Sequence, residues 1–517
     1  MFSGGNYTFR NASSNTTVGW VGSSDHRGTL DILYSSGATI LLCVWISTYP
    51  NVPAPRDRLY HRLIDKFNLA MIGFLGPDLL FALALGQWSS ARRSVEEFRR
   101  VVPNDKDRSW SITHGFYADM GGFRIVSNRE EDGIPTEDGI PVNAKQLLYL
   151  VEHEYIDIPS LKEKEIKAMS ASDTFSKVLV LWQVCWFTVT EVMRFGYHAP
   201  ITTLELTAFI FAVMMLATSF AWFQKPQITR STCIKLRNGL SFQDIRDTAR
   251  TSTHPNMQDR WYETPLDFIW KRGSFQLDKQ WQYFSYLSHL CRVPLFTRLP
   301  SGKNKAWERM PSDIWYRPRG FLVPLGLVVQ VPFCLSFLGA WKFHFATRAE
   351  QVLWRTSAVY HAAYSLVITI YYILGLGEQK HTDNVMALPA QINQNYHQPP
   401  PAESQLCVIV PSKTNISILA SPTQVVSSRC LDTEQGLNCQ KISLKQKQLP
   451  VAWYWRNLSP GGDPDQEISL RWTTLLFILT VIYIFSHLYI YLEDIISLRS
   501  QPAEVFLANN QFFPLIS

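Results

Sequence analysis

Residues 177–224 read KVLVLWQVCWFTVTEVMRFGYHAPITTLELTAFIFAVMMLATSFAWFQ, and this stretch decides the fold. It holds two apolar runs, 178–195 and 201–223. Each run is long enough to cross a bilayer as a helix that rises about 1.5 Å per residue. The turn between them, 197–200, is so short that the second helix must return antiparallel to the first. The sequence therefore predicts a helical hairpin inside a membrane.

The composition fits a membrane protein once its patterning is considered. The mean hydropathy of -0.06 is that of a soluble protein only because apolar and polar residues are segregated into long blocks. A window of about 19 residues is the proper measure. The net charge of +6 comes with basic residues clustered beside apolar blocks, which indicates membrane orientation rather than nucleic-acid binding. We therefore expect the lipid bilayer as a partner and no nucleic acid, while protein partners stay open.

Seven apolar segments are candidates for the membrane: 30–49, 67–86, 178–195, 201–223, 321–341, 357–376 and 472–492. The second of them has Gly76-Pro77-Asp78 at its centre. Proline removes a backbone hydrogen-bond donor, and an aspartate at the middle of a bilayer is costly. A broken or re-entrant helix explains this triplet, and so does an ordinary span with a kink.

The basic residues set the predicted orientation. Arg56, Arg58, Arg62 and Lys66 follow the first segment, so the positive-inside rule places the preceding tail outside and this loop in the cytoplasm. If all seven segments span, the two most basic loops fall outside. If 67–86 dips in and returns, both loops are cytoplasmic, and we prefer this solution. The membrane is predicted to be the plasma membrane or another membrane of the secretory route.

The predicted fold class is all-α, a polytopic transmembrane helical bundle with long cytoplasmic loops. Its tail carries N-glycosylation sequons at Asn6, Asn11 and Asn15. A near-tandem repeat at 131–135 and 137–141 is typical of a flexible loop. The predicted divisions are a polar extracytoplasmic tail (1–28), two membrane segments (29–86), a basic cytoplasmic loop region (87–176), the hairpin (177–224), a cytoplasmic polar region (225–318), two membrane segments (319–376), a low-complexity loop (377–470), a last membrane segment (471–493) and a C-terminal tail (494–517).

Four charged residues inside apolar segments are candidates for an ion or substrate path: Asp78, Glu191, Arg194 and Glu205. Glu191 and Arg194 are three residues apart and share a helix face. Glu205 begins the returning helix at the same depth and could reach Arg194. A Glu–Arg–Glu cluster that locks the hairpin is favoured over an ion site. His487, in the last segment, is interpreted as a hydrogen-bonded packing residue.

His114 and Asp119 have the H-x4-D spacing of glycerolipid acyltransferases, in which the aspartate orients the histidine as a base. The further signatures of those enzymes are absent. The favoured alternative is a tightly packed structural element at 110–123, in which Gly121-Gly122 permits a close approach or an unusual turn. No other catalytic motif, metal-ligand spacing or cofactor-binding motif occurs, so the sequence predicts no metal and no cofactor.

Several short elements together suggest a family. They are NVPAP at 51–55, MGGF at 120–123, LEL at 204–206 and LE at 492–493. This series resembles a large family of multi-spanning membrane proteins that is abundant in filamentous fungi. The resemblance covers most of the chain apart from 377–470 and implies architecture and membrane location. The family carries no established activity.

Three functions therefore compete. The first is a non-catalytic membrane scaffold or sensor. The second is a channel or transporter that uses the buried carboxylates. The third is a membrane-bound acyltransferase-like enzyme. The first two are close, and the enzyme ranks last.

Overall fold

In the computed structural model, the described residues all belong to one compact unit. They are 17–22, 27–101, 110–127, 129–131, 134, 137–170, 174–196, 199–255, 257–290, 304–374 and 470–506. The sequons at Asn6, Asn11 and Asn15 and almost all of the predicted loop 377–470 lie outside these residues.

The long helices form what we call the bundle. They are α1 (Thr29–Ile46), α2 (Leu59–Leu75), α3 (Pro77–Val101), α7 (Thr174–Gly196), α8 (Thr203–Ala221), α11 (Leu322–Ser336) with its 3-10 extension η3 (Phe337–Lys342), α12 (Arg348–Leu374) and α14 (Leu470–Ile496). Among the described residues, four helices are long and apolar enough to cross a membrane, namely α1, α8, α11 with η3, and α14. The bent pair of α2 and α3 is either a broken span, which would be the fifth, or a re-entrant pair. For α7 and α12, crossing stays a prediction.

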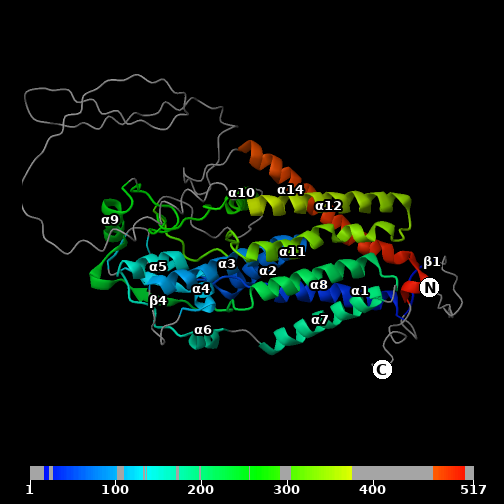
Figure 1. Cartoon of the computed structure of the whole chain (residues 1–517), viewed down its shortest axis with the longest axis horizontal. Coiled ribbons are helices and arrows are strands. Elements are labelled where there is room, and N and C mark those ends of the chain that lie inside the picture. Colours follow the sequence, from blue (N-terminus) through cyan, green and yellow to red (C-terminus); the bar gives the residue numbers. More distant parts are fainter. Residues whose placement is uncertain are drawn as a thin grey trace, which may run out of the picture. The chain divides into compact units, whose positions relative to one another are not determined.

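The predicted hairpin consists of α7 and α8, which pack against each other and against α1 (Figure 1). A capping box begins the second helix. The Thr202 hydroxyl accepts a hydrogen bond from the Glu205 backbone N–H at 3.1 Å, and the Glu205 carboxylate accepts one from the Thr202 N–H at 2.9 Å. Reciprocal capping satisfies two backbone donors that a helix start leaves without partners. The short turn thus fixes where the returning helix starts.

A sharp break separates α2 from α3. The first helix ends at Leu75, and Pro77 opens the next, where its fixed φ suits a first helical position. The two helix directions differ by 119°. A bend of this size rules out the simply kinked span. The broken or re-entrant alternative therefore describes Gly76-Pro77 correctly.

Both outer ends of this pair lie against the same polar part of the chain. Asp65 of α2 is ion-paired with Arg309. Gln87 of α3 donates a hydrogen bond to the Ser312 carbonyl at 3.3 Å. The pair therefore leaves that polar part and comes back to it.

We call this part, the described residues of 110–170 and 225–316, the polar module. It contains α4 (Ile112–Asp119), β2 (Phe123–Val126), β3 (Ile140–Val142), α5 (Ala144–Glu152), α6 (Glu163–Met169), β4 (Thr232–Lys235), η2 (Arg237–Gly239), α9 (Phe242–Ser252) and α10 (Gln276–Leu290). Strand β2 is central, antiparallel to β3 and parallel to β4. A core of buried apolar side chains, including Phe123, Leu147 and Phe242, holds the module together.

The module corrects two predictions. The fold is mostly helical but not all-α, because β2, β3 and β4 form a sheet. The region 87–176, predicted as a loop region between membrane segments, contains the folded elements α4, β2, β3, α5 and α6. The second copy of the repeat, expected to be flexible, leads into β3, and the buried Arg124 guanidinium donates to the Asp138 and Gly139 carbonyls. The repeat looked flexible because its partners lie elsewhere in the sequence.

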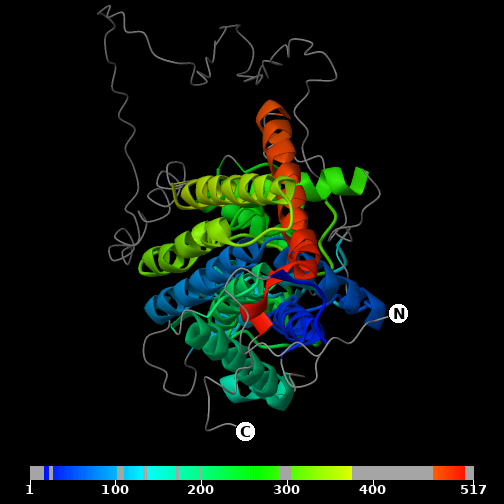
Figure 2. The same cartoon turned by 90° about the vertical axis from the view of Figure 1, so that its right-hand side faces the viewer.

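The two ends of the described chain meet at the other end of the bundle, the end that faces the viewer in Figure 2. Strand β1 (Thr17–Val18) pairs with β5 (Gln501–Pro502), between η7 (Ser497–Arg499) and η8 (Ala503–Phe506). Leu498 and Phe506 pack against Ile32 and Leu204. We call residues 17–22, 27–28 and 497–506 the cap. These parts of the predicted tails 1–28 and 494–517 are thus packed, not free.

Candidate functional site

The MGGF element is a packing element. Gly121 has a φ of +76°, a conformation that favours glycine. A Cβ on Gly122 would lie 2.3 Å from the ring of Tyr117. That ring is fully buried, and its hydroxyl lies 3.0 Å from the Thr232 hydroxyl next to β2. Both the close approach and the unusual turn expected of the two glycines are therefore present.

His114 and Asp119 form hydrogen bonds with backbone groups and not with each other. Nε2 of His114 lies 2.9 Å from the Leu161 carbonyl, which can only accept, so this nitrogen carries the hydrogen. Nδ1 accepts from the Ser111 N–H at 3.1 Å. Asp119 accepts from the Ala144 N–H at 3.1 Å. Burial lowers the pKa of His114 and raises that of Asp119 to about 6. In the described structure the two residues do not form the oriented acid–base pair that an acyltransferase needs.

Lys225 joins the polar module to the bundle, a role that its sequence context does not reveal. Its Nζ donates to the Gln87 side-chain oxygen at 2.9 Å, and the Trp222 indole N–H donates to the same oxygen at 3.1 Å. Burial lowers the pKa of Lys225 to about 7, against the opposing charge of Asp119. The lysine thus ties the end of α8 to α3.

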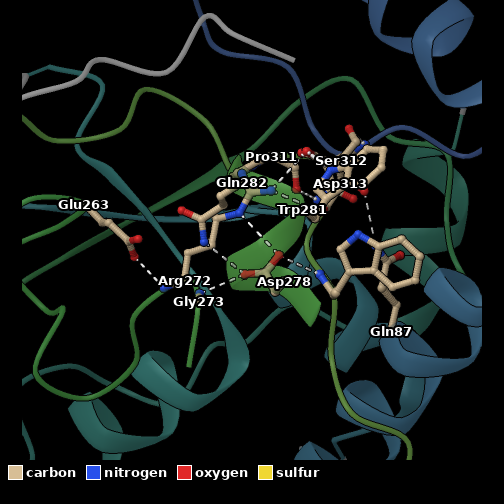
Figure 3. A network of polar contacts seen from close by, with 12 residues as sticks. Gln87, Glu263, Arg272, Gly273, Asp278, Trp281, Gln282, Pro311, Ser312 and Asp313 are labelled. Atoms are coloured by element: carbon tan, nitrogen blue, oxygen red, sulfur yellow. Dashed lines mark hydrogen bonds and ion pairs between the residues drawn. The ribbon is translucent and has the colours of Figure 1, made fainter. Parts of the chain in front are cut away.

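A second unpredicted cluster surrounds Arg272 (Figure 3). Its guanidinium is ion-paired with Asp278 and Asp313, and its backbone N–H donates to Glu263 at 2.6 Å. Burial raises the pKa of Glu263 to about 8, although the charge of Arg272 opposes this. The Trp281 indole donates to Asp313 at 2.7 Å. These contacts hold the segments around Glu263, Arg272 and Asp313 together. No group of His, Cys, Asp and Glu among the described residues could hold a metal ion.

The structure brings the predicted Glu191, Arg194 and Glu205 together at the cap end of the hairpin, all of them buried. Glu205 is ion-paired with Arg27, where the sequence suggested Arg194. Arg194 donates to the Pro200 carbonyl at 2.9 Å and to the Val505 carbonyl at 3.3 Å. These contacts tie the hairpin turn to the cap.

Asp78 occupies a different place, inside the bundle at the break between α2 and α3. It is 2% exposed. Its Oδ1 accepts a hydrogen bond from the Tyr483 hydroxyl at 3.1 Å, and this hydroxyl lies 3.5 Å from Nε2 of His361. The interactions of Asp78 within the described chain involve neutral groups and no Lys or Arg. A carboxylate so placed is costly in hydrocarbon unless it takes up a proton or a cation.

A second histidine lies beside this group. The ring centres of His361 and His487 are 5.2 Å apart. Nε2 of His487 lies 2.6 Å from the Tyr491 hydroxyl, which donates its only hydrogen to the Phe74 carbonyl at 2.6 Å. Nε2 of His487 therefore carries the hydrogen of the ring. Its Nδ1 is buried without a hydrogen-bond partner among the described residues.

The polar groups continue towards the cap. Tyr491 interacts electrostatically with both Asp78 and Asp494. Asp494 is fully buried against Thr203 and Thr207 of α8. We call this set the polar line: Asp78, Tyr483, His361, His487, Tyr491 and Asp494. The spacing of His487, Tyr491 and Asp494, four and then three residues, was a sequence signal for one polar helix face. His361 lies in the predicted apolar segment 357–376 but was not singled out there.

Residues 6–240 match the model of a family of unknown function (DUF8562). The matched region includes Asp78, the MGGF element and the hairpin, and ends before α11, α12 and α14. No curated protein and no solved structure matches the chain. Like the family that the sequence resembles, this family has no established activity. The fungal origin stays a prediction.

Proposed function

We propose that the chain is a multi-pass membrane protein whose bundle binds and transfers a proton along the polar line, as proton-coupled transporters do. The cap would lie outside the cytoplasm with the tail, and the polar module inside. The observation that carries this proposal is Asp78, a buried carboxylate with neutral partners beside two buried histidines. Chains of acidic and histidine side chains are the usual proton relays of pumps and transporters.

The hydrogen bonds at Asp78 allow one balanced proton transfer. A proton arriving at Nδ1 makes the His361 ring a cation. The ring then passes its Nε2 hydrogen to the Tyr483 oxygen, while the hydrogen of Tyr483 passes to Asp78. The transfer leaves a neutral acid and a neutral imidazole. The tyrosine is unchanged, so the carboxyl can be reset by the reverse path.

Asp78 is buried, and the polar side chains beside it extend towards the cap. Towards the polar module, α3 continues with the fully buried Leu80, Phe81 and Leu83. In the other direction the polar line leads to Asp494 and the cap. Release to the module side would therefore require movement of α2 against α3 at the Gly76 break. Broken helices near the midplane are where transporters place sites that change access.

Reconstituted vesicles test this function. The full chain is placed in liposomes that contain a pH-sensitive dye, and proton entry is followed after an imposed pH step and potential. We expect entry above that of empty liposomes, abolished by Asp78→Asn and lowered by Tyr483→Phe. Glu152→Gln, the same chemical change at an exposed position of α5, is the matched control. Wild-type entry equal to empty liposomes, or full entry with Asp78→Asn, would overturn the proposal.

A non-transporting scaffold or sensor is the second candidate. The Arg27–Glu205 pair and the hydrogen bonds of Arg194 to the Pro200 and Val505 carbonyls favour it, because they brace the bundle without opening a path. For a scaffold, Glu191→Gln and Glu205→Gln would lower only the amount of folded protein. The third candidate, an acyltransferase, would be contradicted if cells with a His114→Ala variant had unchanged lipid profiles.

A further inference from the structure

The first half of α2 carries a basic stripe. Arg58 caps the helix, and Arg62 and Lys66 follow at intervals of four residues, so the three share one face. Beside this stripe lies an apolar surface whose side chains are between 45% and 70% exposed. It is made of Leu59, Tyr60, Leu63, Ile64 and Phe67. A helix with charged and apolar surfaces side by side is typical of a membrane interface.

These basic side chains lack the acidic partners that their neighbours have. Arg56 is paired with Asp138, and His61 lies 3.6 Å from a carboxylate oxygen of Asp57. Within the described chain no carboxylate is paired with any residue of the stripe. The Nε of Arg62 is buried without a hydrogen-bond partner there. The three positive charges of the stripe are therefore not neutralised by a carboxylate of the described chain.

The position of α2 indicates where that charge would come from. Asp65, on another face of the helix, is buried and bound to Arg309 of the polar module. Nζ of Lys66 lies 4.4 Å above the ring of Trp45, at the last turn of α1. The stripe thus sits where the bundle meets the polar module. If the bundle spans a membrane, as proposed above, this is the level of the lipid headgroups.

We propose that the stripe binds anionic phospholipid headgroups in the leaflet that faces the polar module. Phosphate oxygens suit the fork of an arginine guanidinium, and the acyl chains would cover the exposed apolar surface beside it. A soluble phosphate would satisfy the charges but leave that surface in water. Anionic lipids concentrate in the cytoplasmic leaflet, the side predicted for the polar module.

Native mass spectrometry of the full chain tests this binding. The protein is purified in detergent and given equal amounts of phosphatidylglycerol and phosphatidylcholine. We compare the wild type with Arg58→Gln/Arg62→Gln/Lys66→Gln. The matched control is Arg56→Gln/Arg129→Gln/Arg237→Gln, which also removes three positive charges, but charges that are already paired within the chain. Circular dichroism establishes that all three proteins are folded.

We expect the wild type and the control to prefer phosphatidylglycerol, and the stripe variant to bind it roughly a hundredfold more weakly at low salt. Raising the salt concentration should weaken the wild-type preference. Equal retention of both lipids by the wild type, or an equal loss in the control, would overturn the lipid site. If the wild type and the control form a dimer and the stripe variant does not, the surface would instead bind a second copy of the chain, and the lipid proposal would be wrong. Retention of no lipid at all would instead count against the membrane placement.

Discussion

Arg27 and Glu205 form an ion pair although 178 residues separate them in the sequence. The arginine stands just before α1, and the glutamate lies in the first turn of α8. Their pairing ties the start of the chain to the central hairpin at the point where Arg194 binds the cap. The last residues of the predicted extracytoplasmic tail are therefore part of the folded bundle.

This pair should contribute strongly to stability. Glu205→Gln leaves the charge of Arg27 without its paired carboxylate, and removal of one partner from a buried pair costs about 3 kcal/mol. Arg27→Gln should be similarly harmful, and the double variant should lose less than the sum of the single losses. Unfolding midpoints in detergent measure these effects. Arg237→Gln, which breaks an exposed pair, is the control and should leave the midpoint unchanged. Additive losses would show that Arg27 and Glu205 act independently.

The MGGF element should tolerate no side chain at its second glycine. Gly122→Ala places a methyl group 2.3 Å from the buried ring of Tyr117, and such overpacking costs about 1–3 kcal/mol. Gly37→Ala is the matched control, because nothing lies within 4 Å of its added carbon and alanine favours a helix. Thermal unfolding should show a loss for the first variant and none for the second. Equal midpoints would contradict the packing described at Tyr117.

Stability should depend on pH through Glu263. Its pKa rises from 4.5 in the unfolded chain to about 8 in the folded protein, chiefly because of burial. The folded state therefore holds this proton more tightly, and the resulting stability is full below 4.5 and is lost as the pH rises through about 8. Glu263→Gln removes this dependence. Unfolding midpoints measured across this pH range should fall less in the variant than in the wild type, and parallel curves would refute the prediction.

The bend between α2 and α3 predicts a topology. Single cysteines in place of Pro55, just before α2, and Glu96, in the last part of α3, should react with an impermeant maleimide from the same side of a sealed vesicle. A cysteine in place of Trp20, in the cap, should react from the opposite side. The eight native cysteines must first be replaced by serine. Reaction of Pro55→Cys and Glu96→Cys from opposite sides would mean that the pair crosses the membrane.

The elements that could be predicted from the sequence are those set by local patterns of apolar residues. The hairpin and the break at Gly76-Pro77 follow from local patterns. The sheet does not, because β2 and β3 are strands of three or four residues. Moreover, β2 pairs with the distant β4, and no local pattern identifies such a partner. Arg27 was missed as the partner of Glu205 for the same reason.

The polar line was predictable only in part. Asp78 stood out because a charge in an apolar segment is expensive. His487 was interpreted as a hydrogen-bonded packing residue, and it is hydrogen-bonded to Tyr491. Its closeness to His361, on another helix, was not predictable from the sequence. Three distant segments of the chain meet there, so only the fold could assemble the group.

The protonation of Asp78 is the most direct test of the proton-binding site. Infrared difference spectra of the protein in lipid nanodiscs, recorded as the pH is stepped, resolve the C=O stretch of a protonated carboxylic acid. We expect a titrating band that shifts in heavy water, disappears in Asp78→Asn and remains in Glu152→Gln. A spectrum in which Asp78→Asn changes no carboxylic-acid band would contradict a proton-binding site inside the bundle.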